Sequence, residues 1–342
     1  MALLDTPFLW VVVAIVVYVI AYKGYGKWID RHVWKSDVKR TTPAHMYMDG
    51  VEFFPVSRYV LWGYQFKSVA ALGPILGPFI GITFGWLPAL AWIIGGNFFI
   101  GWLQDYGALM LSVRKEGRSF GPITYEFTGA SGRRNLLAFV MFYLIIISAT
   151  FIALIAVFWN IFHGTFVATV GIFVAGVLSG QLLYRWKMNV IAVTAIGIAL
   201  VIVSIYIGVL VPVTLPFGAW NVAVWAAVAA VILYLAAILP TPMFIQPTNY
   251  LAFFPAYAAI IFILAGALLS PFTNVTVKLP AFTSFYNATI GPIWPILFVA
   301  IACGAISGWH SLVSSSSSSK QLDIETDALP VGGGAMLSEG LL

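Results

Sequence analysis

The sequence has very little charge and almost no cysteine. Of its 342 residues only 8% are Asp, Glu, Lys or Arg, and Cys303 is the single cysteine. Soluble domains are about a quarter charged, so this composition excludes a soluble enzyme and a disordered chain. One cysteine cannot form an intramolecular disulfide, and it excludes a metal site built from several cysteines.

Signatures of catalysis are missing as well. The sequence contains no GxSxG, HExxH or P-loop motif, and His32, His45 and His163 have no metal-ligand spacing. We therefore expect no enzymatic activity, no cofactor and no bound metal.

Long apolar runs are what the sequence has instead. Hydrophobic residues make up 61% of the chain, and the mean hydropathy is +0.97. A helix that crosses the hydrocarbon core needs about 20 mostly apolar residues. Nine stretches meet this need: 7–22, 68–85, 86–113, 135–162, 165–184, 189–211, 220–238, 250–270 and 293–313. The sequence therefore predicts an all-α, polytopic transmembrane helix bundle of about nine spans.

The positions of Lys and Arg predict the orientation, because basic loops are retained on the cytoplasmic side. If the loop 23–67 is cytoplasmic and every stretch crosses, all 17 basic residues except Lys278 lie inside. This arrangement places the amino terminus outside and the carboxyl terminus in the cytoplasm, in a cell (inner or plasma) membrane. The same loop mixes its basic residues with acidic ones, so its charge fits anionic lipid headgroups and we expect no nucleic-acid partner.

One predicted span is interrupted by two prolines. Residues 72–81 read LGPILGPFIG, with Pro74 and Pro78 four positions apart. Each proline leaves the carbonyl four residues earlier without its helical partner, and broken helices of this kind form substrate sites in transporters. Gly73 and Gly77 are also spaced for close helix packing, so a substrate site and a kinked packing helix both remain open.

Ionisable and polar residues inside the other spans are further site candidates. Asn97, Gln104 and Asp105 lie on one stripe of their predicted helix. An acid at membrane depth usually faces the bundle interior or a water path and suits reversible protonation, although it can also serve only to hold helices together. His310, near the inner end of the last span, is either a proton relay or an interfacial hydrogen-bonding residue.

The last part of the chain differs from the spans before it. Six consecutive serines, 314–319, are of low complexity and favour a flexible connection, and the chain stops at VGGGAMLSEGLL without a polar tail. We expect a transmembrane domain over 1–313 and, over 314–342, a serine-rich cytoplasmic connection with an end that looks truncated.

Several long motifs resemble the carbon starvation protein family. They are YGKWID at 25–30, MDGVEFFPVSRYVLWGYQFKSVAALGPILGP at 48–78, GWLPALAWIIGGNFFIGWLQDYGALMLSVRKEGRSFG at 85–121 and CGAISGWHSLVSS at 303–315. The resemblance covers nearly the whole chain, and motifs of this length and order are highly specific.

The resemblance implies a many-helix inner-membrane transporter for peptides or pyruvate, coupled to protons and related to the amino acid–polyamine–organocation transporters. It carries over Gly73, Pro74, Gly77, Pro78, Gln104, Asp105 and His310 as candidates. Family members usually have a glycine and threonines where this chain has serines at 316–319. They also continue through several more membrane helices after the point where this chain ends.

The sequence therefore predicts secondary active uptake of a small organic solute, a short peptide or pyruvate, driven by protons and linked to carbon starvation. The alternative is a non-transporting membrane subunit or half-transporter, whose missing helices a second chain supplies. The expected partners are thus the solute, protons, the lipid bilayer and, in the alternative, that second chain.

Overall fold

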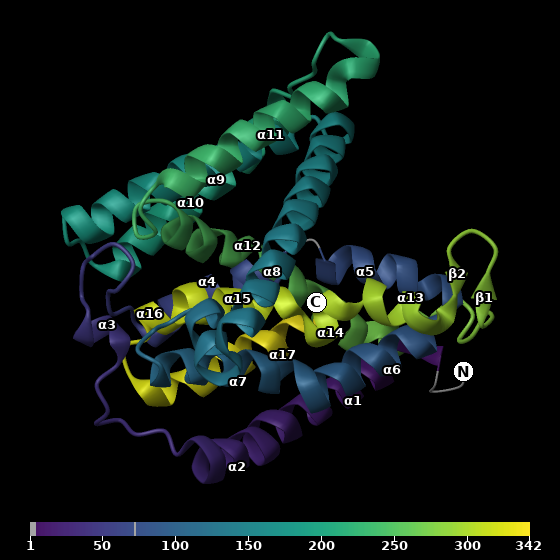
Figure 1. Ribbon diagram of the computed structural model, residues 1–342. Coiled ribbons are helices and arrows are strands. Elements are labelled where there is room, and N and C mark those ends of the chain that lie inside the picture. Colours follow the sequence, from purple (N-terminus) through teal and green to yellow (C-terminus); the bar gives the residue numbers. More distant parts are fainter. Residues whose placement is uncertain (1–4, 72) are drawn as a thin grey trace. The chain divides into compact units, whose positions relative to one another are not determined.

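A computed structural model describes residues 5–71 and 73–342 (Figure 1). The chain forms two compact units. Among the described residues, unit 1 contains 5–49, 53–71, 73–120 and 255–342, and unit 2 contains 50–52 and 121–254.

The described residues confirm a helical membrane protein. They contain seven helices that are long and apolar enough to cross a membrane, or eight if one bent pair is counted as a span. The bent pair is α4 (Arg58–Val69) with the helical stretch Gly73–Phe84, and the two helices are bent by 41° relative to each other. The predicted ninth stretch, 293–313, is divided into three short helices.

Unit 1 begins with one long helix that changes its winding several times. Its parts are α1 (Pro7–Ile20), a π-helical turn (Ala21–Gly26), α2 (Lys27–Ile29) and a second π-helical turn (Asp30–Trp34). The elements that follow are α3 (Pro43–Met46), α4 (Arg58–Val69), α5 (Gly73–Gly81), a 3-10 turn (Ile82–Phe84), α6 (Trp86–Gly96), a π-helical turn (Asn97–Gly101) and α7 (Trp102–Arg114). The predicted loop 23–67 is therefore helical at both of its ends.

The carboxyl-terminal part of unit 1 is made of short pieces. After α12 (Ile245–Thr273), which begins in unit 2, come the antiparallel strands β1 (Tyr286–Asn287) and β2 (Gly291–Pro292). The helices that follow are α13 (Ile293–Ala300), α14 (Ala302–Ile306), α15 (Gly308–Val313), a π-helical turn (Ser314–Ser318), α16 (Ser319–Gln321), 3-10 and π turns (Glu325–Asp327 and Leu329–Gly334) and α17 (Ala335–Glu339).

The serine run belongs to this packed region. Ser314, Ser315, Ser318 and Ser319 are buried. Ser112 on α7 donates to the backbone carbonyl of Ser315. The sequence favours a flexible connection here, whereas the structure shows helix. Gln65 bonds the hydroxyls of Ser314 and Ser318, and Ser112 bonds that of Ser319, so the buried hydroxyl groups have partners.

Unit 2 consists of long, nearly continuous helices. They are α8 (Phe120–Ile161), α9 (Thr165–Gly180) with a π-helical turn (Gln181–Arg185), α10 (Val190–Leu210), a 3-10 turn (Gly218–Trp220), α11 (Asn221–Ile238) and the first part of α12. Gly164 and Gly208 let two neighbouring helices touch through their backbones, because a Cβ at either glycine would come closer than 3.0 Å to the other's carbonyl oxygen. This close contact between small residues is typical of membrane helix pairs.

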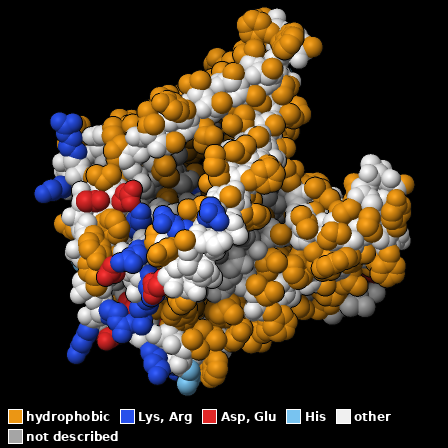
Figure 2. All heavy atoms as spheres, viewed as in Figure 1, with side chains coloured by type: hydrophobic (Ala, Val, Ile, Leu, Met, Phe, Trp, Pro, Cys, Tyr) orange, Lys and Arg blue, Asp and Glu red, His pale blue; other side chains and the backbone are white. Residues whose placement is uncertain are grey.

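Apolar side chains cover most of the face shown in Figure 2. In α8, only 6% of the most apolar window is buried inside the protein. A soluble protein could not expose so much apolar surface to water, so the exposed sides of these helices are suited to lipid.

Candidate functional site

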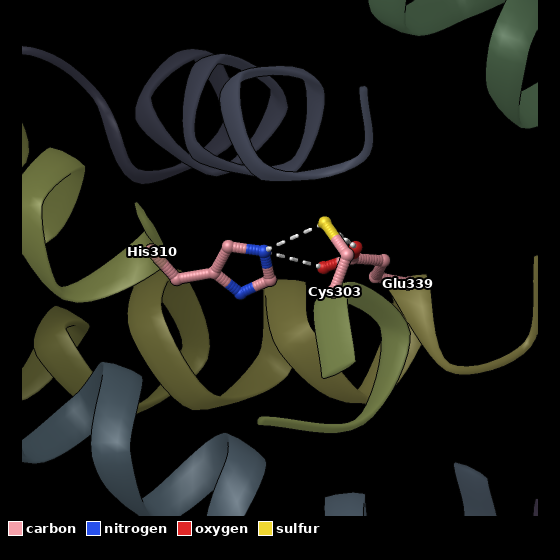
Figure 3. Close-up of side chains that lie close together, drawn as sticks. All are labelled: Cys303, His310 and Glu339. Atoms are coloured by element: carbon pink, nitrogen blue, oxygen red, sulfur yellow. Dashed lines mark hydrogen bonds and ion pairs between the residues drawn. The ribbon is translucent and has the colours of Figure 1, made fainter. Parts of the chain in front are cut away.

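Four ionisable side chains from four separate helices meet inside unit 1. Asp105 comes from α7, Cys303 from α14, His310 from α15 and Glu339 from α17. His310 Nδ1 lies 3.0 Å from Asp105 Oδ2, and His310 Nε2 lies 3.3 Å from Glu339 Oε2. The imidazole is therefore held between two carboxyl groups. Figure 3 shows Glu339 and Cys303 together at one of its nitrogens. We call these four residues the buried cluster.

The buried cluster is shielded from its surroundings. The side chains of Asp105, His310 and Glu339 are at most 1% exposed. Ionised groups at such depth are costly unless they are paired, and Asp105 Oδ1 has no hydrogen-bond partner among the described residues. Groups in this arrangement can exchange a proton through the imidazole, or can share a cation.

A break in the helix next to His310 helps to place it. Ser307 has extended backbone torsions and separates α14 from α15. Gln104 Nε2 donates to the Ser307 carbonyl at 2.7 Å and to Ser311 Oγ at 2.8 Å. The predicted site residue Gln104 thus supplies a partner for a carbonyl that the break leaves outside a helix.

Asn97 holds α17, the helix that carries Glu339. It is fully buried, and its Nδ2 donates to the Met336 carbonyl on α17 at 3.0 Å. Asn97 begins a π-helical turn, and a Cβ at Gly101, the last residue of that turn, would lie closer than 3.0 Å to the Ala305 carbonyl oxygen. The π-helical turn Asn97–Gly101 therefore allows α14 and α17 to pack closely against it.

The glycines of the interrupted span lie in close contact with neighbouring helices. A Cβ at Gly73 would come closer than 3.0 Å to Cys303, and one at Gly77 closer than 3.0 Å to the Ala300 carbonyl oxygen. Pro74 is buried and Pro78 is half-buried inside α5. The structure therefore places Gly73 and Gly77 directly against α13 and α14.

The carbonyl released by the first proline has found a partner. Pro74 has no N–H to offer to the carbonyl of Ala70. The ammonium group of Lys67 donates to that carbonyl at 3.1 Å instead. Lys67 also interacts electrostatically with Glu339, so the interrupted span and the buried cluster are connected through this lysine.

Sequence reasoning identified Asp105 and His310 separately, and the structure brings them together. It missed Glu339, Cys303 and Lys67. Glu339 is the single acid between residues 328 and 342, in an otherwise small and apolar segment, which was the available signal. It was overlooked because that segment was assigned to a region outside the membrane domain.

A second set of charged residues, centred on Glu325, connects early and late segments of unit 1. The carboxylate of Glu325, which is fully buried, accepts from Arg114 Nε at 2.5 Å, from Arg40 Nη1 at 3.2 Å and from the backbone N–H of Asp37 at 2.8 Å. These contacts connect residues 37–40, the end of α7 and the turn Glu325–Asp327. The sequence places Arg40 and Arg114 on the cytoplasmic side only through their charge, and it gives no sign of their contact with Glu325.

An open cavity of about 330 Å³ lies beside α17. Its walls are mainly aliphatic and aromatic, with one cation; they are Ile15, Tyr18, Val19, Tyr22, Lys23, Trp62, Pro330, Gly334, Leu337, Ser338 and Leu341. The hydroxyl of Tyr18 donates to the carbonyl of Gly340, the residue after Glu339, at 3.4 Å. The short helix α17 therefore contributes Leu337 and Ser338 to the cavity wall and Glu339 to the buried cluster.

Comparison with known proteins gives a consistent result. The chain is 34% identical to the pyruvate/proton symporter BtsT of Escherichia coli (strain K12), over 98% of this chain and 48% of that protein. It is 33% identical to the peptide transporter CstA of the same organism, again over 98% of this chain and 48% of that protein. It is 30% identical to the peptide transporter CstA of Bacillus subtilis (strain 168), over 97% of this chain and 56% of that protein.

The chain thus spans about half the length of the curated relatives that it matches. No solved structure matches it. Residues 7–342 match the family described as carbon starvation protein CstA. Taken with its helices of membrane-spanning length and the buried cluster, this match shows that the chain is a multi-pass membrane protein of the carbon starvation protein CstA family.

Proposed function

We propose that this chain takes part in secondary active uptake of small organic solutes, driven by protons. The observation that carries the proposal is the imidazole of His310 held between Asp105 and Glu339 within a membrane domain. Ionisable side chains inside membrane domains mark ion and proton pathways far more often than structural positions.

The names of the relatives support the solute class. One relative is named a pyruvate/proton symporter and others are named peptide transporters. Those names are of transporters and not of enzymes, in line with the missing catalytic motifs. Pyruvate and short peptides both carry a carboxylate, so we propose a small carboxylate-bearing solute for this chain.

In the proposed mechanism Asp105 takes up a proton from the outer side and releases it to the cytoplasm. The imidazole of His310 is the neighbour with which Asp105 exchanges that proton, 3.0 Å away. Gly73, Pro74, Gly77 and Pro78 act by letting the bent span pack against α13 and α14. Asn97 and Gln104 hold the neighbouring helices in register.

The proposed orientation has the amino terminus outside and the carboxyl terminus in the cytoplasm of the cell (inner or plasma) membrane. The distribution of Lys and Arg supports it. Lys278 lies alone on the external side in this arrangement.

The test is uptake into proteoliposomes that contain only this chain. Radiolabelled pyruvate and a radiolabelled dipeptide are supplied with and without an inward proton gradient. Gradient-dependent accumulation of either solute supports the proposal. No accumulation by well-inserted protein contradicts it.

The matched variant is Asp105→Asn, which keeps the shape of the side chain and removes its charge. We expect accumulation to be lost while membrane insertion is unchanged. Glu116→Gln, at an exposed acid paired with Arg118, is the control and should keep full uptake. Unchanged accumulation by Asp105→Asn would remove Asp105 from the mechanism.

A further inference from the structure

Three different metal-binding groups meet within the buried cluster. One donor atom from each of Cys303, His310 and Glu339 lies within 4.8 Å of the other two (Figure 3). His310 and Glu339 are fully enclosed, and Cys303 is half-buried. We propose that these three residues form a binding site for a zinc ion.

The distances are close to those of a tetrahedral site. Zinc binds sulfur at about 2.3 Å and nitrogen or oxygen at about 2.0–2.2 Å, which places neighbouring ligand atoms about 3.3–3.6 Å apart. His310 Nε2 and Glu339 Oε2 already lie 3.3 Å apart. Cys303 Sγ lies 4.0 Å from His310 Nε2 and 3.9 Å from Glu339 Oε1. The two contacts of Glu339 use different oxygens, so rotation of its carboxylate together with a shift of the cysteine side chain would bring the three donor atoms, now within 4.8 Å of one another, to zinc distances.

The chemistry of the three ligands selects the metal. Magnesium and calcium prefer oxygen ligands only, whereas a thiolate together with an imidazole suits zinc. On binding, the thiol of Cys303 releases its proton to solvent, and the resulting thiolate donates an electron pair to the ion. Thiolate and carboxylate then balance the two charges of zinc, while the imidazole stays neutral.

Asp105 completes the arrangement from the other side of the imidazole. Its Oδ2 lies 3.0 Å from His310 Nδ1, so Nε2 is the nitrogen that points to Cys303 and Glu339. A carboxylate behind a ligating histidine is the usual second partner in zinc sites, where it fixes the tautomer and the ring orientation. Asp105 is therefore a positioning residue for the metal.

The location of the ligands implies what the ion would do. They come from α14, α15 and α17, and Ser307 separates the first two helices. A zinc ion would join the three helices through bonds much stronger than their present contacts. If the proposed transport function holds, this joint opposes the helix movements that uptake requires, so zinc is an inhibitor of uptake.

Metal binding is tested on the full chain, which is purified without a polyhistidine tag and then freed of metal with a chelator. Equilibrium dialysis against Zn²⁺ should give one ion per chain. Cys303→Ser should weaken binding at least about tenfold, whereas His163→Gln, outside the buried cluster, should leave it unchanged. Dialysis against Mg²⁺ alone should give no bound ion.

Cobalt provides a direct signature of the sulfur ligand. Co²⁺ added to the metal-free protein should produce a sulfur-to-metal charge-transfer band that Cys303→Ser lacks. Less than one tightly bound zinc per chain, or equal zinc affinity in wild type and Cys303→Ser, would overturn the site. Neither measurement depends on transport.

The inhibitory role is tested separately by adding Zn²⁺ to the proteoliposome assay. Uptake by wild type should fall at least tenfold at saturating zinc. Uptake by Cys303→Ser, compared with its own rate without zinc, should need at least about tenfold more zinc for the same fractional loss. Stoichiometric zinc without any loss of uptake would overturn the inhibition while the metal site stands. Absence of uptake in the zinc-free protein would instead count against the proposed function.

Discussion

Single residues in this protein show how strongly burial changes the importance of a charge. Glu325 and Glu116 are both acids paired with arginine in unit 1. The Glu325 side chain is 0% exposed, and that of Glu116 is 51% exposed. The arginines that pair with Glu325 are 29% and 43% exposed. Its pairing therefore lies between a fully buried pair, whose disruption costs about 3–5 kcal/mol, and an exposed pair, which contributes about 0–1 kcal/mol.

We therefore expect Glu325→Ala to lower the free energy of unfolding by about 1.5–3 kcal/mol, because the charge-assisted hydrogen bonds from Arg114 and Arg40 are lost. Thermal unfolding of the detergent-solubilised protein, followed by circular dichroism, measures the change. Glu116→Ala is the control and should shift the midpoint very little. Equal shifts for the two variants would contradict the role assigned to Glu325.

At the residue scale, part of the site could be predicted from the sequence. Asp105 and His310 were identifiable because each is a rare ionisable residue in an apolar stretch. Their contact was not, because α7 and α15 are far apart in the chain, and only folding brings them within 3.0 Å. Glu339 was missed because its surroundings indicated a chain end and not a membrane helix.

The elements themselves were easier to predict than their interruptions. Long apolar runs fix the helices of unit 2, because lipid leaves helix as the only way to satisfy the backbone. In unit 1 the stretch 293–313 was predicted as one span and is three short helices. Its hydropathy is that of a span, but tertiary contacts such as Gln104 with Ser307 satisfy the backbone where helix is lost.

The packing of α5 provides a test at this scale. Gly77→Ala would place a methyl group closer than 3.0 Å to the Ala300 carbonyl oxygen. Because the backbone of α13 must move to accept it, we expect a loss of about 1–3 kcal/mol and a lower unfolding temperature. Gly95→Ala in α6 meets no atom within 4 Å and should instead be neutral or slightly stabilising. Similar behaviour of both variants would show that α5 does not pack as described.

For the whole molecule, the testable statement is the orientation. In a Cys303→Ser background, we expect Lys278→Cys to react with a membrane-impermeant maleimide added to intact cells, because Lys278 is placed outside. Lys187→Cys should react only after the membrane is permeabilised. If Lys187→Cys reacted in intact cells and Lys278→Cys only after permeabilisation, the orientation would be the opposite of the one proposed. The route of the proton would then be reversed as well.

Lys67 gives the bent span a property that an ordinary helix lacks. In an unbroken helix the partner of the Ala70 carbonyl is a backbone N–H, which cannot leave without unwinding the chain. Here the partner is an ammonium group on a flexible side chain, so the carbonyl can be released by rotation of that side chain alone. Release breaks one charge-assisted hydrogen bond, a change of about 1.5–3 kcal/mol. The end of α4 is therefore held in part by a side-chain contact that depends on the charge of Lys67.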